Sequence, residues 1–181
     1  MTHRLFVGIR PPAAIRDALI DLMDGVDHAR WQDEDQMHLT LRYIGEVDTH
    51  CADELAERLR AAAMPGFALT IAGTGIFEKK GVAHTLWAGL DPSPELARLH
   101  QRVERICIAC GIAPEARKYH PHVTLARLNR AAGPLVPFLA RTASLRLGPW
   151  QADSYILYES TLRPTGSIYD PVIRYPLEPG P

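Results

Sequence analysis

The strongest constraint on this chain is a short pattern that occurs twice, His-apolar-Thr-Leu at residues 38–41 and again at residues 122–125. The chain has 8 histidines, 10 threonines and 21 leucines among 181 residues, of which 46% are hydrophobic. From these frequencies, chance alone would produce the pattern about 0.02 times. Two copies therefore indicate that the pattern has a structural or chemical role.

Each copy has the alternation of a β-strand, in which successive side chains point to opposite faces. His38 and Thr40 would share one face of the first strand, and His122 and Thr124 one face of the second. The apolar residues between them would face a core. If the two strands lie near one another, two imidazoles and two hydroxyls would border a single groove.

Length and charge limit the kinds of protein to consider. A chain of 181 residues suits one domain or two closely packed lobes, and we expect residues 1–181 to form a single two-lobed domain. Its 20 basic and 21 acidic residues give a net charge of −1, which argues against a protein that coats nucleic acid. An enzyme that grips the end of an RNA strand through a local basic site remains compatible with this charge.

Three cysteines, an odd and small number, indicate a reducing compartment. Cys107 and Cys110 form a Cys-x-x-Cys pair without a second ligand pair, so we interpret them as buried thiols and not as a zinc or redox site. The N-terminus has no secretory signature, and no run of about 18 apolar residues is present. We therefore expect a cytoplasmic protein with no metal, no cofactor and no membrane contact.

Hydrophobic periodicity predicts interleaved strands and helices. Strands are predicted at residues 5–9, 30–32, 37–44, 67–77, 85–90, 121–128, 144–147, 152–162 and 173–177, and helices at residues 13–23, 52–63, 94–110 and 134–141. Asp48 or Thr49 would cap the second helix and Ser93 the third. Because neighbouring strands often follow one another directly, the pattern favours a mixed α+β fold over a doubly wound parallel sheet.

The spacing of the two motifs also predicts an architecture. His38 and His122 are 122 − 38 = 84 residues apart, close to half the chain, and each motif belongs to a block of strands and one long helix. We therefore expect two similar lobes of mostly antiparallel β-sheet, with flanking helices, around a central groove.

The residues of the two motifs fit acid–base chemistry at phosphorus. Histidine has an ordinary pKa of about 6.5, so one imidazole can take a proton from attacking water while another protonates a departing oxygen. The hydroxyls of Thr40 and Thr124 can donate hydrogen bonds to the nonbridging oxygens of a phosphate. No metal is required, because the acidic residues at 33–35 have the pattern of a solvated turn.

The surroundings of the motifs resemble a known family. The matching segments are residues 4–9, 30–31, 41–46, 120–127 and 157–162. Together with the paired His-x-Thr motifs, they resemble the two-histidine phosphoesterase superfamily, and in particular the bacterial and archaeal RNA 2′,3′-cyclic phosphodiesterases, also described as 2′-5′ RNA ligases. The resemblance runs over nearly the whole chain.

The resemblance implies an enzyme that opens 2′,3′-cyclic phosphates on RNA ends or nucleotides and leaves a 2′-phosphate. It implies His38 and His122 as catalytic residues, and we assign His122 as the base and His38 as the acid. We expect a monomer. Three alternatives stay open: 2′-5′ RNA ligation, hydrolysis of another cyclic nucleotide, and a non-catalytic module that binds RNA ends.

Arg127 is the next residue that we assign to phosphate binding. Guanidinium groups fit phosphate oxygens, and the resembled family has an arginine at the position of Arg127. Strict alternation would turn Arg127 away from His122, so a bulge or strand end must redirect it. Arg42 would share a face with His38, as a second cation or an exposed strand residue.

Other aromatic and histidine residues receive more ordinary interpretations. Core packing is the expected role of the three aromatic residues that could otherwise stack a base, namely Trp31, Tyr43 and Tyr119. His120 has no counterpart before the first motif, so it is expected to be a polar strand residue. His84 and His100 are expected at the surface.

Overall fold

The computed structural model describes residues 1–179. The elements are β1 (Thr2–Ile9), α1 (Ala13–Ile20), β2 (Arg30–Trp31), β3 (Leu39–Asp48), α2 (Thr49–Arg58), β4 (Phe67–Lys79), β5 (Val82–Leu90), α3 (Pro94–Ala109), β6 (His122–Arg127), α4 (Val136–Thr142), β7 (Arg146–Ala152), β8 (Ser154–Arg163) and β9 (Gly166–Pro176), with 3-10 turns at Glu34–Gln36 and Leu59–Ala62. The α+β prediction is confirmed.

Local sequence signals explain where the helices begin. The side chain of Asp48 accepts a hydrogen bond from the backbone N–H of Cys51 and caps α2, and Ser93 caps α3 through the N–H of Leu96. Helix ends were predicted less well, because α1 ends at Ile20 instead of residue 23 and α2 tightens into a 3-10 turn after Arg58. Terminal turns often tighten in this way.

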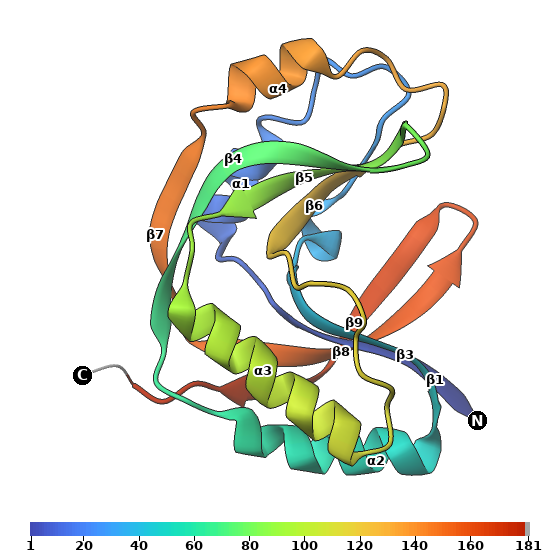
Figure 1. The fold of residues 1–181 in the computed structure, drawn as a ribbon, viewed down its shortest axis with the longest axis vertical. Coiled ribbons are helices and arrows are strands. Elements are labelled where there is room, and N and C mark those ends of the chain that lie inside the picture. Colours follow the sequence, from blue (N-terminus) through green and yellow to red (C-terminus); the bar gives the residue numbers. More distant parts are fainter. Residues whose placement is uncertain (180–181) are drawn as a thin grey trace.

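Of the C-terminal strands, β8 lies where a strand was predicted, at residues 152–162, whereas β7 and β9 differ from their predictions. The structure has β7 at Arg146–Ala152, between two predicted strands, and β9 is much longer than the predicted strand at residues 173–177. The reason is pairing between strands: β9 pairs with β8 along nearly its whole length, from Gly166 to Pro176. This hairpin projects from the rest of the molecule (Figure 1), and much of it lacks the alternation of a half-buried strand.

The strands form one antiparallel sheet in the order β7-β4-β5-β6-β3-β1-β8-β9, with β2 beside β6. The sheet divides into two halves that meet where β6 pairs with β3 (Figure 1). Helices α2 and α3 pack on the half that contains β1 and β3, and α1 and α4 contact β7 and β4 of the other half. The two-lobed architecture is therefore confirmed.

The expected blocks, each with several strands and one long helix, would make each lobe one half of the sequence. The observed lobes do not follow this division. β8 and β9 return from the C-terminus to pair beside β1, and α3 from the middle of the chain covers β3. The half of the sheet that contains β1 and β3 is thus assembled from both ends of the chain. This crossing gives the two lobes a shared hydrophobic core.

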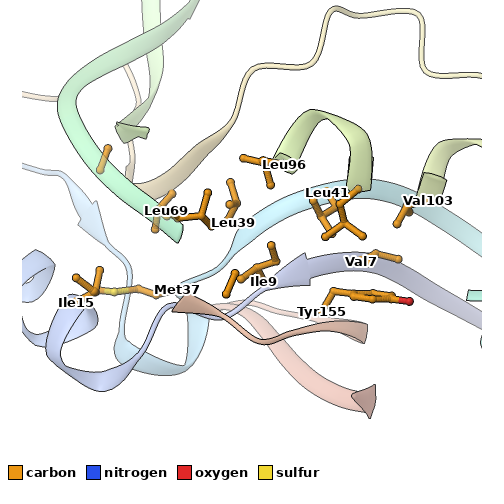
Figure 2. Close-up of a cluster of buried hydrophobic side chains, with 14 of the residues drawn as sticks. Val7, Ile9, Ile15, Met37, Leu39, Leu41, Leu69, Leu96, Val103 and Tyr155 are labelled. Carbon is orange, nitrogen blue, oxygen red and sulfur yellow. The ribbon is translucent and has the colours of Figure 1, made fainter. Parts of the chain in front are cut away.

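The core explains which faces of β3 and β6 are covered. Figure 2 shows Leu96 and Val103 of α3 directed toward Leu41 of β3. Leu39 and Val123, the residues between the histidine and threonine of each motif, are fully buried. Burying large apolar side chains of this kind stabilises a fold by roughly 1.5–3 kcal/mol each. Packing on this apolar face therefore fixes the register of both motif strands.

Candidate active site

The two motifs meet at the single point where the lobes join. Leu39 of β3 is the antiparallel partner of Val123 of β6. If this register is extended by one residue in each direction, His38, which directly precedes β3, comes across from Thr124, and Thr40 across from His122. The two histidines would then be diagonal neighbours, which in an ideal strand pair lie about 7–8 Å apart and somewhat closer between Cβ atoms. We call the side of β3 and β6 that carries these four residues the histidine face.

The two imidazoles are held in the same way. Nδ1 of His38 lies 2.8 Å from the carbonyl oxygen of Gln36, and Nδ1 of His122 lies 2.8 Å from the carbonyl oxygen of His120. A carbonyl oxygen can only accept, so each Nδ1 carries the hydrogen. In the neutral ring Nε2 is then left without a proton and can act as a base.

The carbonyl that orients His38 is itself fixed. Gln36 forms a reciprocal capping box with Asp33, in which each side chain accepts a hydrogen bond from the other's backbone N–H. The Nε2 group of Gln36 also donates to the carbonyl oxygen of Ser167 in β9, at 2.9 Å. Asp33, one of the acidic residues expected to form a solvated turn, therefore helps to set the position of His38.

Aromatic rings surround both histidines. The ring of His38 lies 4.6 Å from that of Phe6 and meets Tyr169 edge-on at 5.0 Å. The ring of His122 meets Phe77 edge-on at 4.8 Å. These rings reduce the access of water, which strengthens electrostatic interactions at the site.

Burial lowers the pKa of both histidines, because a charged imidazole loses solvation there. The pKa of His38 falls to about 4, and the nearby charges of His122 and Arg127 add to the effect of burial. The pKa of His122 is also lowered, first by burial and then by His120 and Arg127. The backbone hydrogen bonds oppose these shifts without cancelling them. Both rings are therefore neutral at pH 7 in the free protein.

This depressed pKa predicts a pH-dependent stability. Unfolded His38 takes up a proton near pH 6.5, whereas the folded protein resists protonation until about pH 4. The contribution of neutral His38 to the free energy of unfolding is therefore present above pH 6.5 and is lost as the pH falls through about 4. Urea unfolding at a series of pH values should show this decline. His38→Ala should flatten it, and the same change at exposed His50 should not.

A bulge in each motif strand redirects the residues that follow. Val7 pairs with Arg42 and Gly8 with Thr40, so Leu41 is an extra residue on β3. In the same way, Leu125 is an extra residue on β6, because the pairing with β5 steps from residue 126 to residue 124. A bulge reverses the alternation beyond it. The fourth residue of each motif is therefore a bulge, which the sequence pattern did not reveal.

The bulge on β6 changes the face on which Arg127 lies. Ala126 takes a buried position, and Arg127 returns to the histidine face. One of its terminal nitrogens donates to the hydroxyl of Thr85 at 3.0 Å. The positive charge of Arg127 also contributes to the lowered pKa of both histidines.

The bulge on β3 turns Arg42 away from the histidine face. Arg42 is therefore neither a second cation for the phosphate nor an exposed strand residue, and both expectations are wrong. Arg42 is 7% exposed and pairs with Glu104 of α3. It also donates to the carbonyl oxygens of Tyr43 and Ala113, each at 2.5 Å. Arg42 is therefore a buried residue that ties β3 to α3. Tyr43, 46% exposed, takes the position on the histidine face instead, so its expected role in the core is also wrong.

Two side chains that sequence reasoning did not place near the site support the bulge on β3. Nδ1 of His100 on α3 bonds to the carbonyl oxygen of Leu41, and the hydroxyl of Tyr119 donates to the carbonyl oxygen of Thr40, both at 2.9 Å. The rings of His100 and Tyr119 stack at 3.8 Å. The expectation that His100 is a surface residue is wrong, because it satisfies a carbonyl that a bulge leaves outside the sheet ladder.

The remaining candidates are placed more simply. Trp31 packs against Phe138, as expected for a core residue. His84 is exposed, also as expected, and lines a cavity of about 350 Å³ together with Phe77, His120 and His122. His38 does not line this cavity, so a single groove that holds both catalytic candidates stays a prediction.

The three cysteines are free thiols, and burial raises the pKa of each. Cys107 is fully buried, and its pKa is raised to about 12. Among residues 1–179, no three or more His, Cys, Asp or Glu side chains are grouped so that they could hold a metal ion. Within the same residues, no helix is long and apolar enough to cross a membrane.

Solved structures of the same shape place this fold in a known class. Escherichia coli LigT complexed with 3′-AMP matches 98% of this chain and 99% of its own, with a TM-score of 0.79 at 24% identity. A Thermus thermophilus protein, TT0787, matches equally well, with a TM-score of 0.79 at 24% identity over 97% of this chain and 98% of that one. These likenesses show that the chain has the LigT-like fold.

The family follows from sequence comparison. Residues 11–154 match the model of the 2′-5′ RNA ligase superfamily, and the chain belongs to this superfamily. A relative in Aeropyrum pernix, named RNA 2′,3′-cyclic phosphodiesterase, is 34% identical over 158 residues, which are 83% of this chain and 90% of the relative. A Thermotoga maritima protein of the same name is 32% identical over 145 residues, 78% of this chain and 75% of its own. The family resemblance seen in the sequence is confirmed.

Proposed function

We propose that this protein hydrolyses 2′,3′-cyclic phosphates on RNA ends or nucleotides to 2′-phosphates without a metal ion. The observation that carries the proposal is the matched pair of histidines. Each has Nδ1 bonded to a carbonyl two residues earlier, and the two lie diagonally across one strand pair. The names of the relatives, which are phosphodiesterases, support the same reaction.

In the proposed reaction, water attacks phosphorus while one histidine takes its proton. The bond from phosphorus to the 3′-oxygen breaks, and the other histidine gives that oxygen a proton. Thr40, Thr124 and Arg127 would bind the nonbridging oxygens, where negative charge increases. Exchange of one proton with solvent at each histidine then restores the starting state.

The division of roles between the histidines can be tested against their pKa values. The sequence led us to assign His122 as base and His38 as acid. In the free protein His38 has a pKa of about 4, which favours it as the proton acceptor. An anionic phosphate between the rings would raise both pKa values, because it stabilises the charged imidazolium. The pH profiles of the two single alanine variants separate the two assignments, since each variant should lose the limb of its own group.

One further activity is supported by the family match. In 2′-5′ RNA ligation, a 5′-hydroxyl of a second RNA would replace water as the nucleophile at the same phosphorus. The same two histidines would serve, because the proton transfers are equivalent. Because both histidines come from one chain, we also propose that residues 1–181 act as a single domain and as a monomer. We propose the cytoplasm as the place of action.

The metal-free mechanism predicts full activity in EDTA. The charge stabilisation that a metal would supply is assigned here to two hydroxyls and one guanidinium. Hydrolysis of a 2′,3′-cyclic nucleotide should therefore proceed at the same rate with and without chelator. Chromatography of the product over time measures this rate. Activity that disappears on chelation and returns with one divalent metal would refute this assignment. If an RNA with a free 5′-hydroxyl end is added to the same assay, the amount of joined product measures ligation.

A further inference from the structure

A cluster of apolar side chains on β1 and β8 lies beside His38. Phe6 of β1 contacts His38 and stacks on Tyr158 of β8, with ring centroids 4.9 Å apart. Ile156 belongs to the same small apolar cluster, which is separate from the main core. A strip of apolar side chains therefore leads from His38 across β1 to β8.

The strip ends at a cavity of about 210 Å³ lined by three arginines. Arg10 follows β1, Arg16 lies in α1, and Arg174 on β9 is the pairing partner of Ile156. Burial raises the pKa of Tyr158, and all three guanidinium groups act against that rise. The lining of the cavity therefore carries three positive charges. We call this cavity the arginine pocket.

Arg16 is the most buried of the three, with 12% of its side chain exposed. Its terminal nitrogens donate to the carbonyl oxygen of Pro11 at 2.6 Å and to Glu34 at 2.7 Å. Its Nε group is buried and has no hydrogen-bond partner within the part of the chain that the structure describes. A buried donor without a partner costs about 1–3 kcal/mol, so a rotation of the Arg16 side chain that turned Nε toward an acceptor in the cavity would be favoured.

The backbone adds to the positive character of the pocket. Pro11 and Pro12 line it, and Pro12 precedes the first turn of α1 without a side-chain cap. In the described structure that turn contains no acidic residue. The N-terminal end of a helix carries a partial positive charge and unpaired N–H groups, which favour anions.

Of the three acidic partners of the arginines, only Asp153 is among the described residues that line the pocket. Glu34, Asp35 and Asp153 pair with Arg16, Arg10 and Arg174, and their side chains are 52%, 89% and 72% exposed. Ion pairs with carboxylates this exposed contribute about 0–1 kcal/mol. An anion inside the pocket can therefore share the guanidinium groups with these carboxylates.

We propose that the arginine pocket binds a phosphodiester of the RNA backbone upstream of the cyclic phosphate. The proposal rests on the proposed function, because it takes the scissile phosphate to lie between the two histidines. The residues of the strip are themselves buried, so an RNA strand that leaves the histidines would pass over β1 and β8 above them. It would then place an internal phosphate at Arg10, Arg16 and Arg174. The substrate class is accordingly an RNA end, and mononucleotides lack the second contact.

Three substrates test the proposal. They are adenosine 2′,3′-cyclic phosphate, the dinucleotide ending in the same cyclic phosphate, and that dinucleotide with a neutral methylphosphonate as its internal linkage. We expect kcat/KM for the natural dinucleotide to exceed that of the other two by about 10-fold, the value of one hydrogen-bonded charge contact. Equal values for the natural and methylphosphonate dinucleotides would overturn the proposal, even if all three were hydrolysed.

Variants locate the contact. Arg10→Gln combined with Arg174→Gln should abolish the preference for the natural dinucleotide and leave hydrolysis of the mononucleotide unchanged. Arg105→Gln, at an exposed position on α3, makes a similar charge change away from the pocket and should preserve the preference. A preference that survives the double substitution would exclude this pocket.

Binding measurements separate failure of the pocket from failure of the proposed function. The dissociation constants of the three compounds are measured with the His38→Ala/His122→Ala double variant, which needs no turnover. Tighter binding of the natural dinucleotide supports the pocket even if hydrolysis is not observed. Equal binding of all three overturns the pocket and leaves the proposed reaction to be judged by its own assay.

Discussion

Replacing His38 or His122 with alanine should lower turnover of a 2′,3′-cyclic nucleotide by about 10²–10⁴-fold, the usual contribution of a positioned acid or base. Each substitution removes one of the two proton transfers and leaves the phosphate contacts in place. Both side chains lie on the histidine face and not in the main core, so the variants should stay folded. Steady-state kinetics with circular dichroism on the same samples measures both effects.

The double variant provides a sharper test of joint action. Because both histidines would act on one transition state, the loss in the double variant should be much smaller than the product of the single losses. Thr40→Ala and Thr124→Ala should each cost less than either histidine, since each removes one neutral donor. His50→Ala, at an exposed position on α2, is the control. A folded His38→Ala or His122→Ala protein with near-normal rates would favour the binding-module alternative.

Replacing Arg42 with alanine should lower the free energy of unfolding by about 3 kcal/mol, near the lower end for breaking a buried ion pair. The substitution leaves Glu104 without its guanidinium partner and removes donors from the carbonyl oxygens of Tyr43 and Ala113. Glu104 is 18% exposed, so water can partly replace the lost contact. Urea denaturation measures the change.

Arg60→Ala is the matched control for that experiment. Arg60 pairs with Glu57, and both side chains are largely exposed, at 62% and 78%. Its loss should change the free energy of unfolding by less than about 0.5 kcal/mol. Equal effects at Arg42 and Arg60 would show that Arg42 does not hold β3 against α3.

The sequence was informative where one local rule decides the structure. Alternation within a strand placed His38 and Thr40 on one face, and the covered core kept that register because a shift by one residue would expose Leu39. Helix starts at Asp48 and Ser93 were predictable for a similar reason, since a single side chain satisfies the first N–H groups.

The features that were missed depend on residues far apart in the sequence. The bulge at Leu41 is stabilised by His100 and Tyr119, whose bonds to residues 41 and 40 span 59 and 79 positions. The residues near Leu41 in the sequence do not predict these partners. The same bulge explains why Arg42, expected on the histidine face, is buried, while Arg127 reaches that face after the equivalent bulge on β6.

The strand pairing within each lobe could not be predicted either, because it also joins segments far apart in the sequence. Equal spacing of the motifs predicts two lobes, but it does not say which strands pair. β1 lies between β3 and β8, so the N-terminal and C-terminal segments complete the same half of the sheet. The contact between Leu39 and Val123 that joins the motifs arises from this arrangement and not from either motif alone.

The most direct test of the central claim is the identity of the product formed in ¹⁸O-labelled water, followed by ³¹P NMR. We expect the wild-type protein to convert a 2′,3′-cyclic nucleotide to the 2′-phosphate alone, with one ¹⁸O atom on phosphorus. The His38→Ala/His122→Ala variant should give almost no product in the same time. A 3′-phosphate, a mixture of both isomers, or equal conversion by the double variant would contradict hydrolysis by the paired histidines.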